Sequence, residues 1–323
     1  MKRDRFFDGK VALVTGGTRG LGLALTRALL ARGAKVAVCA RDPNEVAAAE
    51  SALAVPDRLF AARCDVTDAA AVGCFVSEAT VRLGPIDILI NNAGTIVVGP
   101  YQDLTLEDVR RVVEVNFFAA VTTMEAVLPE MRRRKSGTIV NVASVGGVIP
   151  VPHLAAYCAG KFALNGFSQT VAAEVRRDGV RVCVVNPGLM RTGSPANATF
   201  KGRTQAEYGW FAASDSLPLA TLSAERAARE ILRACKIGRP FTVLGAPARL
   251  GALAHALLPN AVNGLLGALN ALLPKPSGER DRYARGHESE STVVPSLLTT
   301  LTQRAERRNN ELPARRPASD LPL

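Results

Sequence analysis

The chain has few of the residues that build metal centres and disulfide frameworks. Its 323 residues include three histidines, His153, His255 and His287, which are far apart in the sequence. The six cysteines form no C-x-x-C pair and fall inside predicted strands and helices, so we expect reduced, buried thiols. A metal site, and with it a zinc-dependent alcohol dehydrogenase, is therefore disfavoured. The cysteines are Cys39, Cys64, Cys74, Cys158, Cys183 and Cys235.

Aromatic residues are also scarce, at 5%, and none of them is interleaved with the basic runs. The net charge of +11 favours an anionic partner, which is a nucleic acid, an anionic lipid or an anionic cofactor. The densest basic run, residues 132–135, comes where a long helix is expected to end, and cations there interact favourably with the helix dipole. Because the chain offers no platform on which bases could stack, we expect no nucleic-acid partner.

The N-terminus shows no secretory signal, because the apolar segment that begins at Val11 is short and is interrupted by Gly16 and Gly17. We therefore expect a cytoplasmic protein. A hydrophobic content of 48% with 21% charged residues is ordinary for a globular protein. The length predicts one main domain, residues 1–245, with additional C-terminal segments.

Strands and helices are predicted to alternate along the first half of the chain. Apolar, β-branched runs predict strands at residues 10–14, 35–39, 59–64 and 86–91, with helical patterns between them. Alternation of this kind predicts an α/β fold, a doubly wound parallel sheet of the Rossmann type with helices on both faces.

The first predicted strand runs directly into a glycine-rich turn, T-G-G-T-R-G-L-G at residues 15–22. Glycines allow a tight turn, and the helix that follows offers free N–H groups to a pyrophosphate. The second strand ends at Ala40 and Arg41, where dinucleotide folds place an acidic residue for the ribose. Arg41, together with Arg19, therefore predicts a 2′-phosphate and hence NADP(H), unless both are solvated surface arginines.

Other polar residues follow the predicted strands. Asp65 can accept a hydrogen bond from an adenine amino group, or it can serve as a turn or capping residue. The sequence N-N-A-G at residues 91–94 ends the fourth strand and is expected to lie against a cofactor. Asn116, inside a helix predicted at 106–134, is either a satisfied core amide or a functional residue.

Ser144, Tyr157 and Lys161 form the most informative group. Ser144 follows a predicted buried strand, so its hydroxyl is expected at the carboxyl edge of the sheet, where open α/β sheets bind ligands. Tyr157 and Lys161 are four residues apart in a predicted helix and project from one face. An ammonium beside a phenol favours the phenolate, and moving the tyrosine pKa from about 10 to about 7 takes roughly 4 kcal/mol. The spacing alone is also compatible with an ordinary surface pair.

These features occur together in one family. In order, they are T-G-x-x-x-G-x-G at 15–22, N-N-A-G at 91–94, Asn116, Ser144, Y-x-x-x-K at Tyr157 and Lys161, and Asn186-Pro187-Gly188 with Thr192. From about Gly9 to Gly245 the chain resembles the short-chain dehydrogenase/reductase family. The resemblance implies an NAD(P)-dependent oxidoreductase, and Ala40, Arg41 and Arg19 resemble its NADP-preferring members.

The resemblance also assigns roles to the site residues. It implies that Tyr157 donates or accepts the proton, Ser144 orients the substrate oxygen, and Lys161 contacts the tyrosine and the nicotinamide ribose. It implies that Asn116 anchors a proton-relay water. We expect NADP(H) to contact Thr15, Gly16, Arg19, Gly20, Leu21, Gly22, Arg41, Asp65, Val66, Asn92, Ala93, Gly94, Tyr157, Lys161, Pro187, Gly188 and Thr192.

The expected function is therefore NADPH-dependent interconversion of a carbonyl and a secondary alcohol, that is, a carbonyl reductase or alcohol dehydrogenase. A non-enzymatic NADP(H)-sensing scaffold and a membrane-associated interaction protein of the same fold are the alternatives. The predicted helices at 106–134 and 154–177 are expected to form a homo-oligomer, since the second carries Phe162, Leu164 and Phe167 beyond its catalytic face.

Three further segments follow Gly188. Residues 189–222 are expected to form a substrate lid, although Trp210 and its aromatic neighbours could instead pack a local core. Residues 246–274 show two leucine stripes separated at Pro259, which predict an amphipathic helical hairpin. Its apolar face could cover the substrate cleft, a second subunit or a membrane surface, and we expect a membrane surface and a lipophilic substrate. Residues 275–323 are expected to be a mostly disordered tail.

Overall fold

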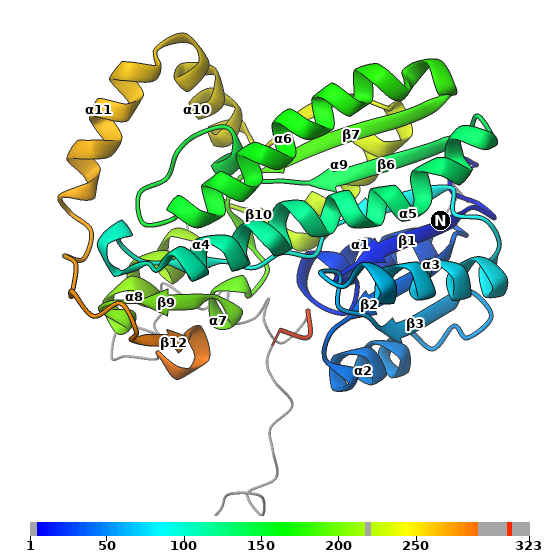
Figure 1. The fold of residues 1–323 in the computed structure, drawn as a ribbon, viewed down its shortest axis with the longest axis horizontal. Coiled ribbons are helices and arrows are strands. Elements are labelled where there is room, and N and C mark those ends of the chain that lie inside the picture. Colours follow the sequence, from blue (N-terminus) through cyan, green and yellow to red (C-terminus); the bar gives the residue numbers. More distant parts are fainter. Residues whose placement is uncertain (1–4, 217–220, 290–308, 312–323) are drawn as a thin grey trace, which may run out of the picture.

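The computed structural model describes residues 5–216, 221–289 and 309–311 (Figure 1). Its centre is a seven-stranded parallel sheet with the strand order β11-β7-β6-β4-β1-β2-β3. The order reverses beside β1, which makes a doubly wound sheet and confirms the predicted fold class. The strands are β1 (Val11–Thr15), β2 (Lys35–Ala40), β3 (Leu59–Arg63), β4 (Ile88–Asn91), β6 (Gly137–Val142), β7 (Val180–Pro187) and β11 (Phe241–Leu244).

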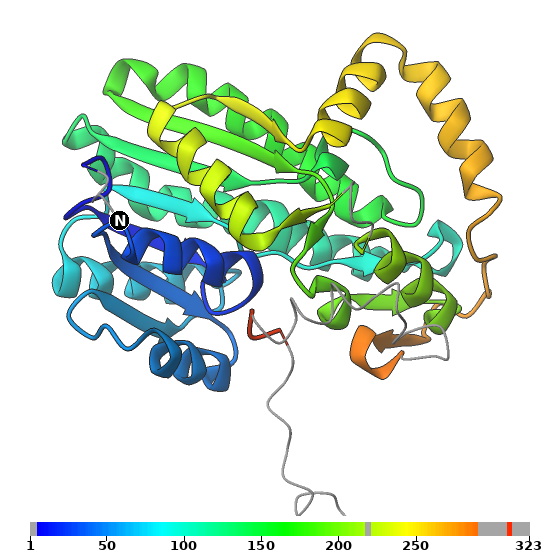
Figure 2. The same ribbon diagram turned by 180° about the vertical axis from the view of Figure 1, so that it is seen from behind.

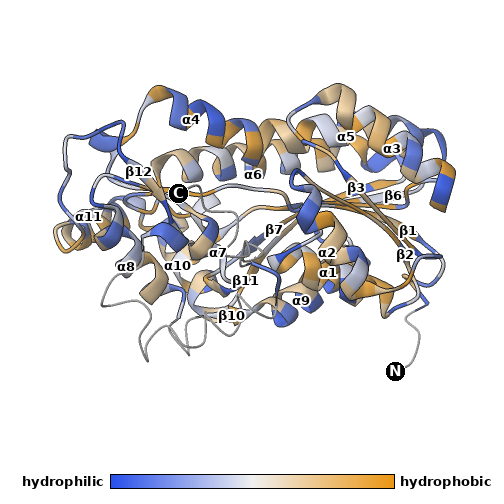
Figure 3. Cartoon of the chain, turned by 90° about the horizontal axis from the view of Figure 1, so that it is seen from below, coloured by the Kyte–Doolittle hydropathy of each residue, from blue (hydrophilic) through white to orange (hydrophobic). Residues whose placement is uncertain are grey.

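Helices cover both faces of this sheet, so the apolar strands lie between two layers (Figure 3). One buried cluster joins the strands to α1 and α9, and a second joins the other face to α3, α5 and α6. Strands buried on both faces explain the continuous apolar runs in the sequence. The helices are α1 (Gly20–Leu30), α2 (Pro43–Leu53), α3 (Ala69–Leu83), α5 (Ala119–Arg133), α6 (Ala155–Val175) and α9 (Ala224–Ile237).

The predicted helix at 106–134 is interrupted by a wider turn. It consists of α4 (Leu106–Val113), a π-helical turn at Glu114–Phe118, and α5. The first helix begins at a capping box between Thr105 and Asp108. Asn116 lies inside the π-helical turn, a type of distortion that is frequent at functional sites.

The expected lid contains short elements rather than a single loop. These are β8 (Met190–Arg191), α7 (Ser194–Asn197), β9 (Thr199–Lys201), α8 (Thr204–Ser214) and β10 (Leu222–Ser223). The rings of Phe200, Tyr208 and Phe211 form a buried cluster, and Trp210 packs against it. The indole N–H of Trp210 donates to Glu207 at 2.7 Å. The local aromatic core, considered above as an alternative for Trp210, is therefore present.

The chain then forms two helices that project from the body, α10 (Ala246–Leu257) and α11 (Pro259–Asn270) (Figures 1 and 2). They are bent by 120° at the predicted break. Within the two helices only Ala248 is buried. The alternative in which the hairpin hides its apolar face in its own substrate cleft is therefore wrong, because most of its leucines are exposed.

Part of the predicted disordered tail is ordered. The backbone N–H groups of Ser277 and Gly278 each donate to the Asp103 carboxylate at 2.8 Å. Residues Tyr283–Arg285 form β12, which pairs antiparallel with β9, and β5 (Val97–Val98) pairs with β9 on its other side. The expectation of disorder from Lys275 is therefore wrong for residues 275–289, and residues 290–308 and 312–323 lie outside the described residues.

One of the predicted buried thiols is exposed. Cys74 lies on the solvent face of α3, whereas the other five cysteines are buried. A short apolar pattern does not distinguish the two faces of this Ala-rich helix, which explains the error.

Candidate active site

The carboxyl ends of β1 and β4 are tied together at the glycine-rich turn. The Thr15 hydroxyl accepts from the backbone N–H groups of Asn92 and Ala93 at 3.0 and 3.1 Å. The Asn92 amide donates in return to the carbonyls of Thr15 and Gly16, both at 3.1 Å. The structure thus joins four of the sequence-predicted cofactor residues by hydrogen bonds at one edge of the sheet.

The glycines of this turn fit a nucleotide-binding role, because side chains would not fit there. A Cβ on Gly22 would lie 1.9 Å from the Gly16 carbonyl oxygen, and Gly16 and Gly20 have φ values of +61° and +53°. The turn opens directly into α1, whose first N–H groups form a positive end. This is the backbone geometry that approaches a pyrophosphate closely.

The π-helical turn places Asn116 beside the N-N-A-G segment. The buried Asn116 amide donates to the carbonyls of Thr95 and Val112 at 2.7 and 3.0 Å, and its oxygen accepts from the Thr95 N–H at 3.3 Å. A Cβ on Gly94 would lie 2.8 Å from the Asn116 amide oxygen and 3.6 Å from the Lys161 ammonium. Asn116 and Lys161 therefore both line the space next to Gly94.

The structure brings Ser144, Tyr157 and Lys161 together at the end of β6. The Ser144 hydroxyl accepts from the Gly146 N–H at 3.1 Å and lies within hydrogen-bonding reach of Tyr157. The Lys161 ammonium donates to the Val142 carbonyl at 3.0 Å and lies 5.8 Å from the centre of the Tyr157 ring. Lys161 is buried, while Tyr157 is half-buried.

Burial controls the charge of both groups. It raises the pKa of Tyr157 to about 12, and the hydrogen bond with Ser144 opposes this rise. Burial also lowers the pKa of Lys161 to about 8. The pKa of Tyr157 is thus raised where the sequence led us to expect a lowered one, and the Lys161 ammonium is directed at the Val142 carbonyl.

Asp215 is a site residue that the sequence pattern did not reveal. It lies at the C-terminal end of α8, 5% exposed, and its negative charge contributes to the high pKa of Tyr157. Burial raises the pKa of Asp215 itself to about 8. A buried carboxyl with a strongly shifted pKa marks a candidate functional residue, but an aspartate in a polar segment gives no such signal in the sequence.

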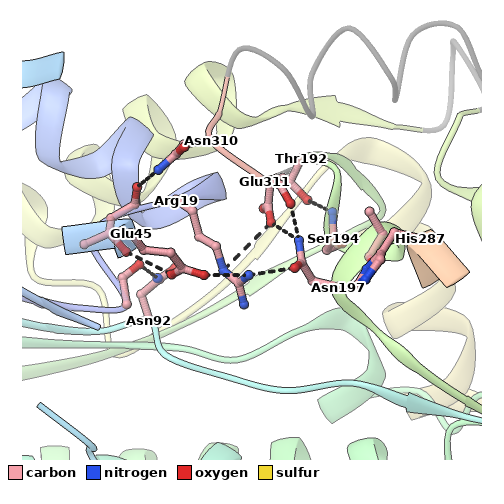
Figure 4. A network of polar contacts seen from close by, with 12 residues as sticks. Arg19, Glu45, Asn92, Thr192, Ser194, Asn197, His287, Asn310 and Glu311 are labelled. Carbon is pink, nitrogen blue, oxygen red and sulfur yellow. Dashed lines mark hydrogen bonds and ion pairs between the residues drawn. The ribbon is translucent and has the colours of Figure 1, made fainter. Parts of the chain in front are cut away.

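The two arginines predicted to hold a 2′-phosphate differ in their surroundings. Arg41 is exposed at the tip of β2, and the Asp42 carboxylate caps α2 by accepting from the Asn44 N–H at 2.8 Å. The Arg19 guanidinium contacts Glu45 at 3.1 Å and donates to Asn197 at 2.7 Å (Figure 4). Arg19 is thus held by neighbours of its own chain.

The remaining predicted cofactor residues border the same edge. Asp65 is a turn residue that accepts from the Thr67 N–H at 3.0 Å and from the Thr67 hydroxyl at 2.8 Å. Burial raises its pKa, but these hydrogen bonds, together with Arg41 and Arg63, lower it overall. Val66 lines a small cavity together with Thr15, Ala93 and Asn116. Beyond β7, the Gly188 N–H donates to the Leu244 carbonyl, and the Thr192 hydroxyl accepts from the Ser194 N–H.

A buried polar network behind the site also escaped sequence analysis. The Asn91 amide donates to Asn141 at 2.9 Å, and the Asn141 amide donates to Ser168 at 2.8 Å. Asn165 and Asn186 exchange two hydrogen bonds at 2.7 and 3.0 Å, which fixes the start of the Pro187-Gly188 segment. Isolated asparagines in apolar strands were the available signal, since buried amides need partners.

The structure combines a doubly wound sheet and glycine-rich turn of the Rossmann type with a Ser-Tyr-Lys cluster at the carboxyl edge of the sheet. A family model described as short chain dehydrogenase matches residues 10–201, more than half of the chain. The chain therefore belongs to the short-chain dehydrogenase family, whose members use nicotinamide dinucleotides and act on small molecules.

Individual proteins show the same relationship. The chain is 38% identical over 183 residues to Oxidoreductase BOA17 of Botryotinia fuckeliana, which covers 57% of this chain and 66% of that protein. It is 35% identical over 188 residues to 3-ketodihydrosphingosine reductase of Bacteroides thetaiotaomicron, covering 58% and 66%. The chain thus spans just under two thirds of the length of these relatives.

A solved structure extends the match over nearly the whole of a related chain. The crystal structure of a short-chain dehydrogenase from Streptomyces avermitilis superposes with a TM-score of 0.68 at 31% identity. The superposition covers 81% of this chain and 98% of that chain.

Proposed function

We propose that this protein is an NADPH-dependent oxidoreductase that interconverts a carbonyl and a secondary alcohol. The observation that carries the proposal is the convergence of four side chains at one edge of the sheet: Asn116 and Lys161 lie beside Gly94, and Tyr157 lies between Lys161 and Ser144. A sensing scaffold without catalysis would need none of these four side chains in this arrangement. The convergence therefore favours an enzyme over the scaffold alternatives.

The side chains suggest a mechanism for the reductive direction. Tyr157, with its raised pKa, is protonated at neutral pH and can donate its proton to a carbonyl oxygen as the C=O bond is reduced. The Ser144 hydroxyl orients that oxygen, and Lys161 stabilises the phenolate that remains. Asn116 holds the backbone at Thr95 and anchors the route by which the proton is replaced. A bound reduced nicotinamide supplies the hydride.

NADP(H) is proposed over NAD(H) because no acidic side chain ends β2. Arg41 is exposed directly after the end of β2, and Arg19 lies within the glycine-rich turn, at the start of α1. Guanidinium groups bind phosphate dianions through paired hydrogen bonds. The missing carboxylate and the two cations therefore support a 2′-phosphate ligand.

Titration with both cofactors tests this choice. We expect NADPH to bind at least about tenfold more tightly than NADH, and Arg41→Ala to remove most of the difference. Arg82→Ala, at the end of α3, is the control and should leave the ratio unchanged. Equal affinity of the unaltered protein for the two cofactors would refute the proposal.

The substrate needs a separate experiment. NADPH consumption should be screened over aldehydes, quinones, keto-steroids and 3-oxoacyl compounds.

A lipophilic substrate and a membrane surface are proposed from the α10–α11 hairpin. Leu250, Leu253, Leu257 and Leu265 are 57% to 69% exposed, and residues 231–278 contain no acidic side chain. An exposed apolar surface flanked by cations such as Arg249 suits an anionic lipid interface. The named activity of the Bacteroides relative, reduction of a lipid-like ketone, is consistent with this proposal.

A further inference from the structure

A short C-terminal segment, Asn309–Glu311, lies against the glycine-rich turn nearly 300 residues away in the sequence (Figure 4). The Gly20 N–H, at the start of α1, donates to the Asn309 carbonyl at 2.8 Å. The Asn310 amide donates to the Thr18 carbonyl at 3.3 Å. The segment therefore bonds to both sides of the turn that is built to approach a pyrophosphate.

The Glu311 carboxylate occupies the space in front of this turn. A Cβ on Gly20 would lie 2.2 Å from the Glu311 Oε1 atom, so the carboxylate rests directly over Gly20. The Asn197 amide donates to the Glu311 carboxylate at 2.8 Å and to its backbone carbonyl at 2.7 Å. A negative group at the N-terminus of a helix is favourable, as a phosphate would be in the same place.

Arg19 is drawn into the same contact. Its guanidinium lies 3.9 Å from the Glu311 carboxylate, on the opposite side from Glu45. Two carboxylates thus neutralise a cation that would otherwise attract a phosphate. Asn309 and Glu311 are 2% and 6% exposed, so the segment is packed into the site and is not a solvated stretch of chain.

The contact also contains an unsatisfied group. The side-chain oxygen of Asn309 is buried and accepts no hydrogen bond within the described structure. A buried acceptor without a donor costs free energy, which weakens the closed arrangement. The segment is therefore held by several polar contacts but is not locked in place.

We propose that Asn309–Glu311 is an autoinhibitory segment that occupies the pyrophosphate position of the cofactor site and must leave before a dinucleotide binds. The inference rests on the proposed use of NADP(H). Glu311 takes the place of the anionic cofactor in front of α1, and it withdraws Arg19 from the cofactor. The apparent affinity for NADP(H) is then lowered by the fraction of molecules in which the segment is in place.

Cofactor affinity of truncated chains tests the proposal. Full-length protein, a chain that lacks residues 309–323 and a control that lacks residues 314–323 are titrated with NADP⁺ by calorimetry. We expect the first truncation to bind NADP⁺ about three- to tenfold more tightly than the full-length protein, and the control to match the full-length protein. Glu311→Gln should give part of this increase in NADP⁺ affinity. Glu279→Gln, which changes an exposed carboxylate elsewhere, should leave the affinity unchanged.

Hydrogen exchange provides a second readout. Saturating NADP⁺ should accelerate exchange of the backbone amides of residues 309–311, because the segment is displaced. Slower exchange, or weaker binding after truncation, would show a clamp that closes over the cofactor and would overturn the proposal, as would equal affinity in all chains. If no chain binds NADP⁺ or NAD⁺, the proposed function itself fails, and the inference fails with it.

Discussion

Tyr157 and Lys161 are both pushed toward their uncharged forms by the protein around them. The raised pKa of Tyr157 keeps its proton available for a carbonyl oxygen, whereas the lowered pKa of Lys161, about 8, lets its ammonium titrate within an accessible pH range. A phenolate formed during reduction would hold Lys161 in its charged form. We therefore expect the two groups to handle the proton together.

Tyr157→Phe removes only the phenolic hydroxyl, so we expect turnover to fall by about a thousandfold or more. The affinity for NADPH should change less than about threefold, because the ring and Lys161 remain in place. Steady-state rates and a binding titration measure the two effects. Tyr101→Phe, at a residue 72% exposed, is the control. Retention of full activity by Tyr157→Phe would exclude the proposed mechanism.

Asp215 should make stability depend on pH. Its pKa rises from 3.8 to about 8 on folding, so the folded state holds a proton that the unfolded state releases. The stabilisation is complete below about pH 4 and is lost progressively as the pH rises toward 8. Asp215→Asn should flatten this decline and stabilise the protein at pH 8 by roughly 1–3 kcal/mol. Urea unfolding at pH 5 and pH 8 measures the free energy of unfolding at each pH. If Asp215→Asn leaves its change with pH unaltered, the raised pKa of Asp215 is contradicted.

At the scale of elements, the apolar periodicity of the sequence predicted which helices and strands form, but not their local distortions. The strands, the break at Pro259 and the positions of Tyr157 and Lys161 on one helix follow from apolar spacing and turn residues. The π-helical turn around Asn116 does not, because the residues from Val112 to Phe118 are mostly apolar and therefore mark no single face from which an inserted residue could be recognised. The pattern therefore predicted the helix but not the distortion that directs the amide at Thr95.

The α10–α11 hairpin is the element on which the membrane proposal depends. Replacing Leu257 and Leu265 by aspartate puts charge into the surface that would enter the lipid, so binding to anionic vesicles should fall at least about tenfold. Flotation of anionic vesicles at low salt measures the fraction of protein bound to them. Val81→Asp, at an exposed apolar residue of α3, is the control. Absence of binding by the unaltered protein would refute a lipid-facing hairpin and leave a second subunit as the partner.

The whole molecule is expected to self-associate through α4, α5 and α6. Phe118 and Phe162 are 48% and 40% exposed on this side, an arrangement that a monomer would leave in water. Phe118→Glu combined with Phe162→Glu should convert dimers or tetramers to single chains, whereas Ile237→Glu on α9 should not. Sedimentation at micromolar concentration measures the mass of the particle in solution. The mass of a single chain for the unaltered protein would contradict the expected self-association.

Contacts between distant parts of the chain were the least predictable. The segment from Ser277 to β12 and the residues Asn309–Glu311 are polar, so composition alone places them in a solvated tail. Their partners, Asp103 and the glycine-rich turn, lie about 170 to 290 residues earlier. No local pattern encodes such pairing, because the fold itself brings the partners together.

The α10–α11 hairpin is fastened at both of its ends. At one end Ala248 packs against Gly188, and at the other Ser277 and Gly278 bond to Asp103. Beyond Gly251, which packs against Ile149, we expect changes in the length of the segment to have little effect on the sheet, since closing a longer loop costs slowly increasing entropy. If the hairpin is the part that contacts a partner surface, we expect another helical pair grafted between Ala248 and Ser277 to change that surface and leave the sheet intact.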